Sequence, residues 1–295
     1  MTKNRISVTC RAKVNLTLDV LDRRPDGYHN LASVMQSIDL ADILRIELVN
    51  HPGIEITSNQ SDIPTGPDNT VHKACSLLLN AVGSDNGVQI TLEKHIPHQA
   101  GLGGGSSDAA GMLVGLNYLL GNPLPKDELY KLAAQIGSDV PYFLIGGTAL
   151  VKGRGDVVEK LLDVPQLQLV IVKPDVGIPT AWAYSRLAEL SRKRTASTSA
   201  MVEAIHTKDR KSVVDHLFND FELVAVEEFP AIKTAKQDLA DLGAEATLLC
   251  GSGSAVFGVF SSSTVTYRAA EQLAGRYPFV VPTITTTSAI MFSGV

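Results

Sequence analysis

The sequence predicts a two-domain protein of the α+β class, and three observations predict it. The chain has 295 residues, close to the size at which a single hydrophobic core stops growing and chains divide into domains. Its first third has the pattern of strands separated by turns. From residue 167 on, strands and helical stretches follow in the ferredoxin-like order β, α, β, β, α, β. We place the boundary near residue 160, which gives domains 1–160 and 161–295.

The first domain begins with strands. Alternating and β-branched residues predict them over 6–10, 13–20, 32–40, 43–49 and 53–57. Apolar residues at helical spacing predict a helix over 69–82, with Asp68 in front as its cap. A strand over 87–94, helices over 106–120 and 126–136, and a hairpin over 146–161 complete this domain.

The second domain begins with a buried strand, LQLVIVK, over 167–173. A long helical stretch over 179–242 follows and is broken at Pro230. Further elements are strands over 246–251, 255–260 and 279–285 and a helix over 267–274.

Composition limits the function classes. Hydrophobic residues make up 44% of the chain and charged residues 19%, as in ordinary globular proteins. A net charge of −5 argues against nucleic-acid binding, so local groups must hold any bound anion. The three cysteines lack CxxC spacing, and the apolar run at 167–172 is too short to span a bilayer. We therefore expect a cytoplasmic protein without membrane or nucleic-acid partners.

The stretch GLGGGSSDAAG, residues 101–111, is the strongest functional signal. Its four glycines among five positions lie between a predicted strand and a predicted helix. Free N–H groups at a helix start bind anions, and glycines let the backbone wrap a phosphate. Ser106 and Ser107 stand where a cap would, with hydroxyls suited to phosphate or metal. A flexible turn before a capped helix is the alternative, but it requires fewer glycines.

Common phosphate-binding motifs do not fit this loop. No lysine follows as Walker A requires, and Ser106 replaces the third glycine of the dinucleotide-binding fingerprint. A second cluster, CGSGSAVFG over 250–258, is typical of a hairpin turn when taken alone. It becomes a candidate for a binding site only in combination with the first glycine loop.

Three segments together resemble the motifs of the GHMP kinase superfamily. They are Ala12–Leu16 near the start, the PxxxGLGGGSS pattern from Pro97 to Ser107, and the loop Gly251–Ser254. The resemblance spans the chain. It implies a two-domain GHMP kinase fold with a ribosomal-S5-domain-2-like N-terminal domain and a ferredoxin-like C-terminal domain.

Two more stretches, RRPDGYHNL (23–31) and IGSDVPYFLIGGTALVKGRG (136–155), are similar to one branch of that superfamily. The resemblance implies ATP-dependent phosphorylation of the 2-hydroxyl of 4-diphosphocytidyl-2-C-methyl-D-erythritol, in non-mevalonate isoprenoid biosynthesis. ATP and Mg²⁺ would be required. No acidic magnesium ligand can be assigned, so ATP and a loop serine are expected to hold the ion.

Asp139 and Lys13 are the candidate catalytic residues. Asp139 precedes Pro141 at a turn, where a carboxylate serves equally as a general base or as a helix cap. Lys13 taken alone is typical of a solvated strand lysine. The resemblance implies that the two pair, with Lys13 keeping Asp139 ionised and stabilising the transferring phosphoryl group.

The resemblance also implies two sets of binding residues. Asn15 and Thr180 would contact the acceptor, while Tyr28, His29 and Tyr184 would hold its cytosine, with Trp182 competing for the place of Tyr184. The nucleotide side would comprise Asn69, Lys94, Pro97, Gly101, Leu102, Gly103, Gly104, Gly105, Ser106 and Ser107, with Gly251, Ser252 and Gly253 opposite. His95 and His98 have HxxH spacing but no further ligand nearby, so we predict no protein metal site.

Two alternatives remain open. One is a superfamily kinase acting on mevalonate or homoserine, against which the cytosine-side residues argue. The other is a nucleotide-binding regulator without catalysis, against which Lys13 and Asp139 argue. The expected partners are ATP and one small-molecule substrate, and the expected state is a monomer or a weak homodimer.

Overall fold

The computed structural model describes residues 4–27, 29–190 and 197–293. Elements of the first half are β1 (Arg5–Arg23), β2 (His29–Val49), β3 (Ile54–Ser58), α1 (Thr70–Val82), β4 (Gly87–Glu93), α2 (Gly104–Leu119), α3 (Lys126–Ile136), α4 (Val140–Ile145), β5 (Thr148–Gly153) and β6 (Val157–Lys160). Those of the second half are β7 (Gln168–Lys173), α5 (Thr180–Glu189), α6 (Ser197–Thr207), α7 (Arg210–Asp215), β8 (Phe218–Asn219), α8 (Glu222–Glu228), α9 (Pro230–Asp241), β9 (Ala246–Leu249), β10 (Val256–Phe260), α10 (Ser263–Leu273), β11 (Phe279–Ile284) and β12 (Ile290–Ser293).

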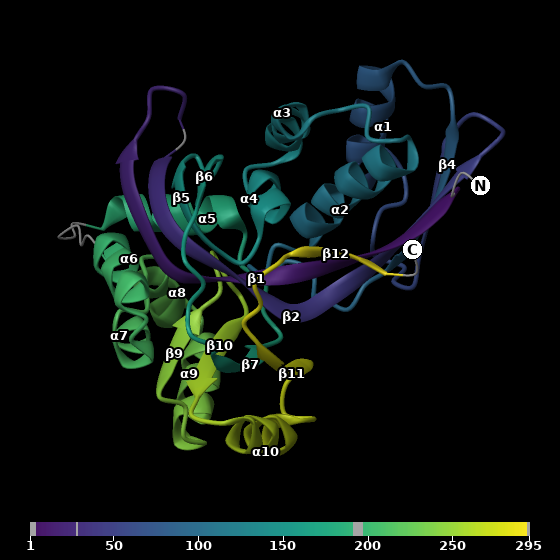
Figure 1. The fold of residues 1–295 in the computed structure, drawn as a ribbon. Helices are drawn as coiled ribbons and strands as arrows, with labels where there is room; N and C mark the ends of the chain where they lie inside the picture. Colours follow the sequence, from purple (N-terminus) through teal and green to yellow (C-terminus); the bar gives the residue numbers. More distant parts are fainter. Residues whose placement is uncertain (1–3, 28, 191–196, 294–295) are drawn as a thin grey trace.

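These strands form two sheets (Figure 1). The larger sheet has the order β12-β1-β2-β4-β3, with β5 and β6 joined to β2, and β8 joined to β1. The smaller sheet has the order β11-β7-β10-β9, and all of its pairs are antiparallel. That order and the helices between its strands confirm the ferredoxin-like arrangement predicted from the sequence.

The first strands differ from the prediction. The segments 6–10 and 13–20 form one strand, β1, and the segments 32–40 and 43–49 form one strand, β2. The register of this pair shifts between Arg11 and Lys13. A bulge leaves an extra residue unpaired and bends the strand without ending it, so the sequence pattern breaks where the strand continues.

The bulge also decides which way Lys13 points. Before it, Val8 and Cys10 pack with α2, whereas beyond it Val14 and Leu16 pack with the smaller sheet. Side chains alternate along a strand, so a change of register exchanges the two faces. Directly beyond the bulge, Lys13 and Asn15 therefore face the side of the sheet on which Asp139 and α4 lie.

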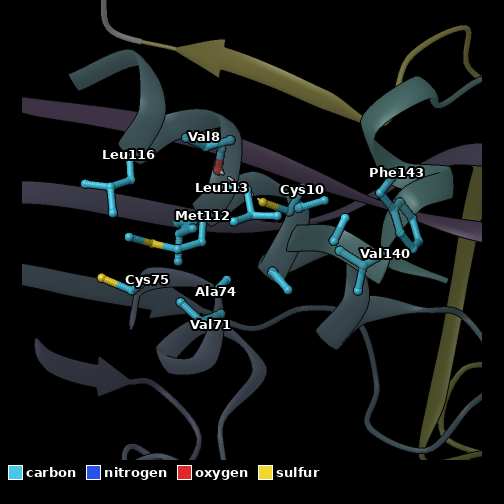
Figure 2. Close-up of a cluster of buried hydrophobic side chains, with 14 of the residues drawn as sticks. Val8, Cys10, Val71, Ala74, Cys75, Met112, Leu113, Leu116, Val140 and Phe143 are labelled. Carbon is cyan, nitrogen blue, oxygen red and sulfur yellow. Dashed lines mark hydrogen bonds between the residues drawn. The ribbon is translucent and has the colours of Figure 1, made fainter. Parts of the chain in front are cut away.

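Helices α1 to α4 cover one face of the larger sheet. Figure 2 shows side chains of α1, α2 and α4 meeting those of β1 in one buried cluster. The opposite face of β1 and β2 packs on the smaller sheet, where Leu16, Ile38 and Phe257 are fully buried. Because both faces are covered, β1 stays buried from Ala12 to Val20, polar residues included.

Two helix starts lie away from the predicted positions. Helix α1 is capped by Asn69, not Asp68, since the Asn69 side chain accepts a hydrogen bond from the Val71 N–H. Helix α2 begins at Gly104, two residues earlier than expected, after Gly103 in left-handed conformation. The glycines that form the loop thus also form the first turn of the helix. Helix α3 and the β5–β6 hairpin lie where the sequence predicts them.

The last strand returns to the larger sheet, because β12 pairs with β1. The described residues after 160 therefore contribute to both sheets. Among the helices of the described ranges, none has both the length and the apolar character needed to cross a bilayer.

Candidate active site

Two cavities lie on either side of the first glycine loop. One, of about 450 Å³, is lined by Lys13, Asn15, Asp139, Tyr184 and the second glycine loop, and we call it the strand cavity. The other, of about 470 Å³, is lined by Asn69, Lys94, Ser106 and the first glycine loop, and we call it the helix cavity. Gln99, Gly101 and Gly103 line both. A ligand in each cavity would therefore meet the other at these three residues.

Lys13 is a buried site residue and not a solvated strand lysine. Only 3% of it is exposed, and its Nζ lies 3.8 Å from Asp139 Oδ2. The same ammonium donates a 2.7 Å hydrogen bond to Asn15 Oδ1, and Asn15 in turn donates to Ser33 Oγ. The chain of contacts fixes the Lys13 head group at the wall of the strand cavity.

Asp139 occupies the N-cap position of α4, yet its side chain makes no capping hydrogen bond. Its side chain is 34% exposed and lines the strand cavity. The carboxylate therefore faces the cavity with Lys13 beside it, and it does not act as a helix cap.

The two glycine loops touch through their backbones. The Ala255 N–H donates to the Ala100 carbonyl, and a Cβ on Gly101 would lie only 1.8 Å from the Cys250 oxygen. A Cβ on Gly251 would lie 3.2 Å from Lys13 Nζ. Gly101 (φ 75°) and Gly251 (φ 52°) are both left-handed, so side chains are excluded there by space and by conformation. The second loop joins β9 to β10 as a hairpin and is also the partner of the first.

Aromatic rings close the strand cavity. Tyr184 lines it, stacks on His29 with 5.4 Å between centroids and 16° between planes, and meets Phe221 edge-on. Burial, and then the charge of Asp139, raise the pKa of Tyr184 to about 12, so its phenol stays protonated. Trp182 instead packs on Phe229 and is not part of the lining.

Two further candidates for acceptor binding are Thr180 and Tyr28. Thr180 lines the strand cavity, and its hydroxyl lies 3.1 Å from that of Ser252. Tyr28 lies outside the described residues.

Lys94 lies at the floor of the helix cavity, where its ammonium group is held in ion pairs. Its ammonium is paired with Asp108 at 2.7 Å and with Asp42, and all three side chains are buried. Burial alone would lower the pKa of Lys94, but the two carboxylates outweigh it and hold this pKa above its usual value. Burial also raises the pKa of Asp108. Lys94 thus brings a fixed positive charge to the cavity, largely balanced by its own partners.

Other candidates on this side divide into ligand-facing and structural groups. Ser106 lines the helix cavity, whereas Ser107 is fully buried and donates to the Arg11 carbonyl. Asn69 uses its amide on Val71 and Pro64 and so shapes the wall. Pro97, Leu102, Gly104 and Gly105 also line the cavity. Within the described residues, no three His, Cys, Asp or Glu side chains could hold a metal ion together.

Sequence reasoning missed several residues of the site. Asp42 and Asp108 hold Lys94, Gln99 lines both cavities, and Phe221 backs Tyr184. Asp108 directly follows the two loop serines, but its burial could not be seen locally. The polar pair Asn219 and Asp220 interrupts a helical stretch directly before Phe221, and this break is the signal that could have pointed to that residue.

Comparisons with known proteins agree with this geometry. The family model described as the GHMP kinases N terminal domain matches residues 69–147, and the one described as GHMP kinases C terminal matches residues 201–278. A relative from Caldicellulosiruptor saccharolyticus, named 4-diphosphocytidyl-2-C-methyl-D-erythritol kinase, is 41% identical over 262 residues, covering 89% of this chain and 90% of its own. The chain belongs to the GHMP kinase family. GHMP kinases use ATP as phosphate donor, so the protein is an ATP-dependent small-molecule kinase.

Further relatives of this GHMP kinase extend the comparison. One from Pelotomaculum thermopropionicum, of the same name, is 43% identical over 272 residues, covering 92% of this chain and 93% of its own. A crystal structure of 4-(cytidine 5'-diphospho)-2C-methyl-D-erythritol kinase has a TM-score of 0.83 at 34% identity, covering 95% of this chain and 99% of its own. A homoserine kinase from Cytophaga hutchinsonii has a TM-score of 0.78 at 21% identity, covering 99% of this chain and 98% of its own, and shows the shared fold alone. The expected two-domain GHMP kinase fold is confirmed.

Proposed function

We propose that this GHMP kinase transfers the γ-phosphoryl group of ATP to the 2-hydroxyl of 4-diphosphocytidyl-2-C-methyl-D-erythritol, a step toward isoprenoid precursors. The observation that carries the proposal is the ion pair of Lys13 and Asp139 beside the glycines shared by the two cavities. Relatives that bear this substrate in their names support the choice of acceptor.

The helix cavity suits the triphosphate of ATP. The first turn of α2 presents free N–H groups there, and the dipole of a helix favours negative charge at this end. Gly103 and Gly104 let the backbone approach closely, so the N–H groups carry the attraction, because the charge of Lys94 below them is balanced by Asp42 and Asp108. With the triphosphate in this cavity, its terminal phosphoryl group reaches the shared glycines.

Asp139 acts as the general base in this mechanism. It accepts the proton of the acceptor hydroxyl as that oxygen forms a bond to the γ-phosphorus. The bond from the γ-phosphorus to the bridging oxygen breaks, ADP leaves with those electrons, and the proton stays on Asp139. Lys13, whose Nζ lies 3.8 Å from Asp139 Oδ2, orients the carboxylate by ion pairing and stabilises charge on the moving phosphoryl group.

The strand cavity suits an acceptor that carries a base. Tyr184 lines this cavity with its ring stacked on His29, and stacking of a base on an aromatic ring contributes about 1–3 kcal/mol. We assign Tyr28 to the same base-binding group, and Asn15 and Thr180 to the methylerythritol side. Mevalonate and homoserine have no ring that would use these faces.

Magnesium would enter with the nucleotide. The buried carboxylates of Asp42 and Asp108 are already paired with Lys94, so they cannot form a carboxylate cage. The hydroxyl of Ser106 lines the helix cavity and fits a single oxygen ligand, the others coming from phosphates and water. When bound, Mg²⁺ neutralises phosphate charge.

The proposal also covers the division of the chain into two parts, its oligomeric state and its location in the cell. We propose a nucleotide-binding part over 1–160, a substrate-side part over 161–295, a monomer or weak homodimer, and action in the cytoplasm. Supporting the last point, Cys10, Cys75 and Cys250 are free thiols buried apart from one another.

The test is ADP release with ATP and Mg²⁺, offering the cytidylyl acceptor beside mevalonate and homoserine. We expect turnover of the cytidylyl acceptor alone, with a product heavier by one phosphoryl group. Preference for another alcohol would reject the assignment of His29 and Tyr184. ATP binding without any turnover would favour a non-catalytic regulator.

A further inference from the structure

The side chain of Asn219 connects three parts of the strand cavity. It is 2% exposed, and both its amide nitrogen and its amide oxygen make hydrogen bonds to the backbone. Its Nδ2 donates to the carbonyls of Leu249 (2.9 Å) and Gly251 (2.8 Å), and its Oδ1 accepts from the Phe221 N–H (3.0 Å). Asn219 also lies in β8, which pairs with β1, the strand that carries Lys13. It therefore fixes the second glycine loop relative to the strand of the ion pair.

The Gly251 contact fixes the orientation of one peptide. Residues 250–253 form a turn closed by the Gly253 N–H and the Cys250 carbonyl at 2.8 Å, so the Gly251–Ser252 peptide is its central unit. In a planar trans peptide, the carbonyl and the following N–H point in opposite directions. Because the Gly251 carbonyl points to Asn219, the Ser252 N–H points away from it.

That opposite direction leads to the strand cavity. Gly251 and Ser252 line this cavity, whereas Asn219 lines a different hollow behind the loop. Within the described residues, no acceptor is paired with the Ser252 N–H. A Cβ on Gly251 would lie 3.2 Å from Lys13 Nζ, so this peptide borders the ammonium group.

We propose that the Ser252 backbone N–H binds the phosphoryl group during transfer, and that Asn219 is the positioning residue that aims it. Preorganised N–H groups stabilise developing charge because they need no reorientation during the reaction. The inference rests on the proposed function, since it concerns the same phosphoryl group. It assigns a role to a residue that never touches the substrate.

The experiment compares Asn219→Asp and Asn219→Ala with Asn117→Asp. Asn117 is the matched control, because it is buried and its amide clamps both backbone groups of Leu124, yet it lies outside both cavities. Aspartate at 219 would set a carboxylate oxygen against two carbonyl oxygens and turn the peptide. We expect kcat to fall about 100-fold for Asn219→Asp and about tenfold for Asn219→Ala. The KM values for both substrates should stay within about threefold, as expected for a contact made only in the transition state.

Asn117→Asp should lower the melting temperature but leave kcat within about twofold of wild type. Equal loss of kcat in Asn117→Asp and Asn219→Asp would overturn the inference, as would unchanged kcat in Asn219→Ala. If Asn219→Asp does not fold, Asn219→Ala decides. Failure of the wild-type protein to phosphorylate the cytidylyl acceptor would reject the proposed function alone. The variants are then compared on the alcohol that is turned over, or on ATP hydrolysis.

Discussion

The strand cavity and the helix cavity are nearly equal in volume, about 450 and 470 Å³, but they are built in different ways. The helix cavity takes its walls from residues 62–70 and 92–108, two short stretches rich in backbone contacts. The strand cavity collects single side chains from β1, β2, α5 and the segments around residues 139, 221 and 251.

The difference separates two kinds of recognition. A triphosphate can be held by consecutive N–H groups, which one local motif supplies. A base and a branched alcohol need side chains from several directions, which only the tertiary fold supplies. Changes in the two cavities should therefore act on different ligands.

The largest expected effect concerns the floor of the helix cavity. Lys94→Met would leave the buried carboxylates of Asp42 and Asp108 without their cation, and breaking such a pair costs about 3–5 kcal/mol of unfolding free energy. Urea denaturation measures the loss. Lys131→Met, which breaks an exposed pair with Glu128, should leave the unfolding curve in place. Equal effects of the two changes would contradict a structural role of the Lys94 cluster.

The next effect concerns the loop shared by both cavities. Gly101→Ala places a methyl group against the Cys250 carbonyl, and misplacement by about 1 Å costs about 100-fold in rate. Gly66→Ala is the control, because Gly66 lines neither cavity and nothing lies within 4 Å of the Cβ that it would gain. Steady-state kinetics with varied ATP should show the loss for the first variant alone. A kinase unaffected by Gly101→Ala would refute the contact between the loops.

A smaller effect is expected in the strand cavity. Tyr184→Ala removes a stacking face, and a loss of about 1–3 kcal/mol raises the KM of the acceptor about 5- to 150-fold. The KM for ATP should not change. Trp182→Ala should lower stability through lost packing on Phe229, without a change in either KM. A rise in acceptor KM for Trp182→Ala and not for Tyr184→Ala would exchange their roles.

The smallest effect is expected for the cysteines, which should not be alkylated in the folded protein. Burial raises the pKa of Cys75 and of Cys250 to about 12, and that of Cys10 is also raised. At pH 8, roughly one such thiol in ten thousand is ionised, so iodoacetamide should not label the folded protein. Mass spectrometry would show three alkyl groups only after unfolding, since the chain has three cysteines. Rapid labelling of the folded protein would contradict their burial.

The same contrast explains what could be predicted from the sequence. Helix α3, the β5–β6 hairpin and the ferredoxin-like strand order follow from local periodicity and turn residues, and the structure confirms them. The continuity of β1 could not be predicted, because its bulge looks like a strand end in the sequence. The motif residues of both cavities could be singled out from the sequence, although their roles remain proposals.

The site residues that could not be predicted from the sequence make hydrogen bonds to positions far away in the chain. Asp42 reaches Lys94 across 52 positions, and Asn219 reaches Gly251 across 32. The sequence around each residue does not identify its distant partner, because a hydrogen bond between distant segments leaves no local pattern. The polar side chains that support a site are therefore harder to predict than the loop that contacts the ligand.

In the mechanism proposed here, phosphoryl transfer takes place where the two cavities meet, with Asp139 as the base. The most direct test is the single-turnover rate of Asp139→Asn with ATP and the cytidylyl acceptor. Asp163→Asn serves as control, because Asp163 is also paired with a lysine but lies outside both cavities. We expect a rate about 1000-fold below wild type, with both ligands bound normally. A rate equal to that of the control would show that another group removes the proton.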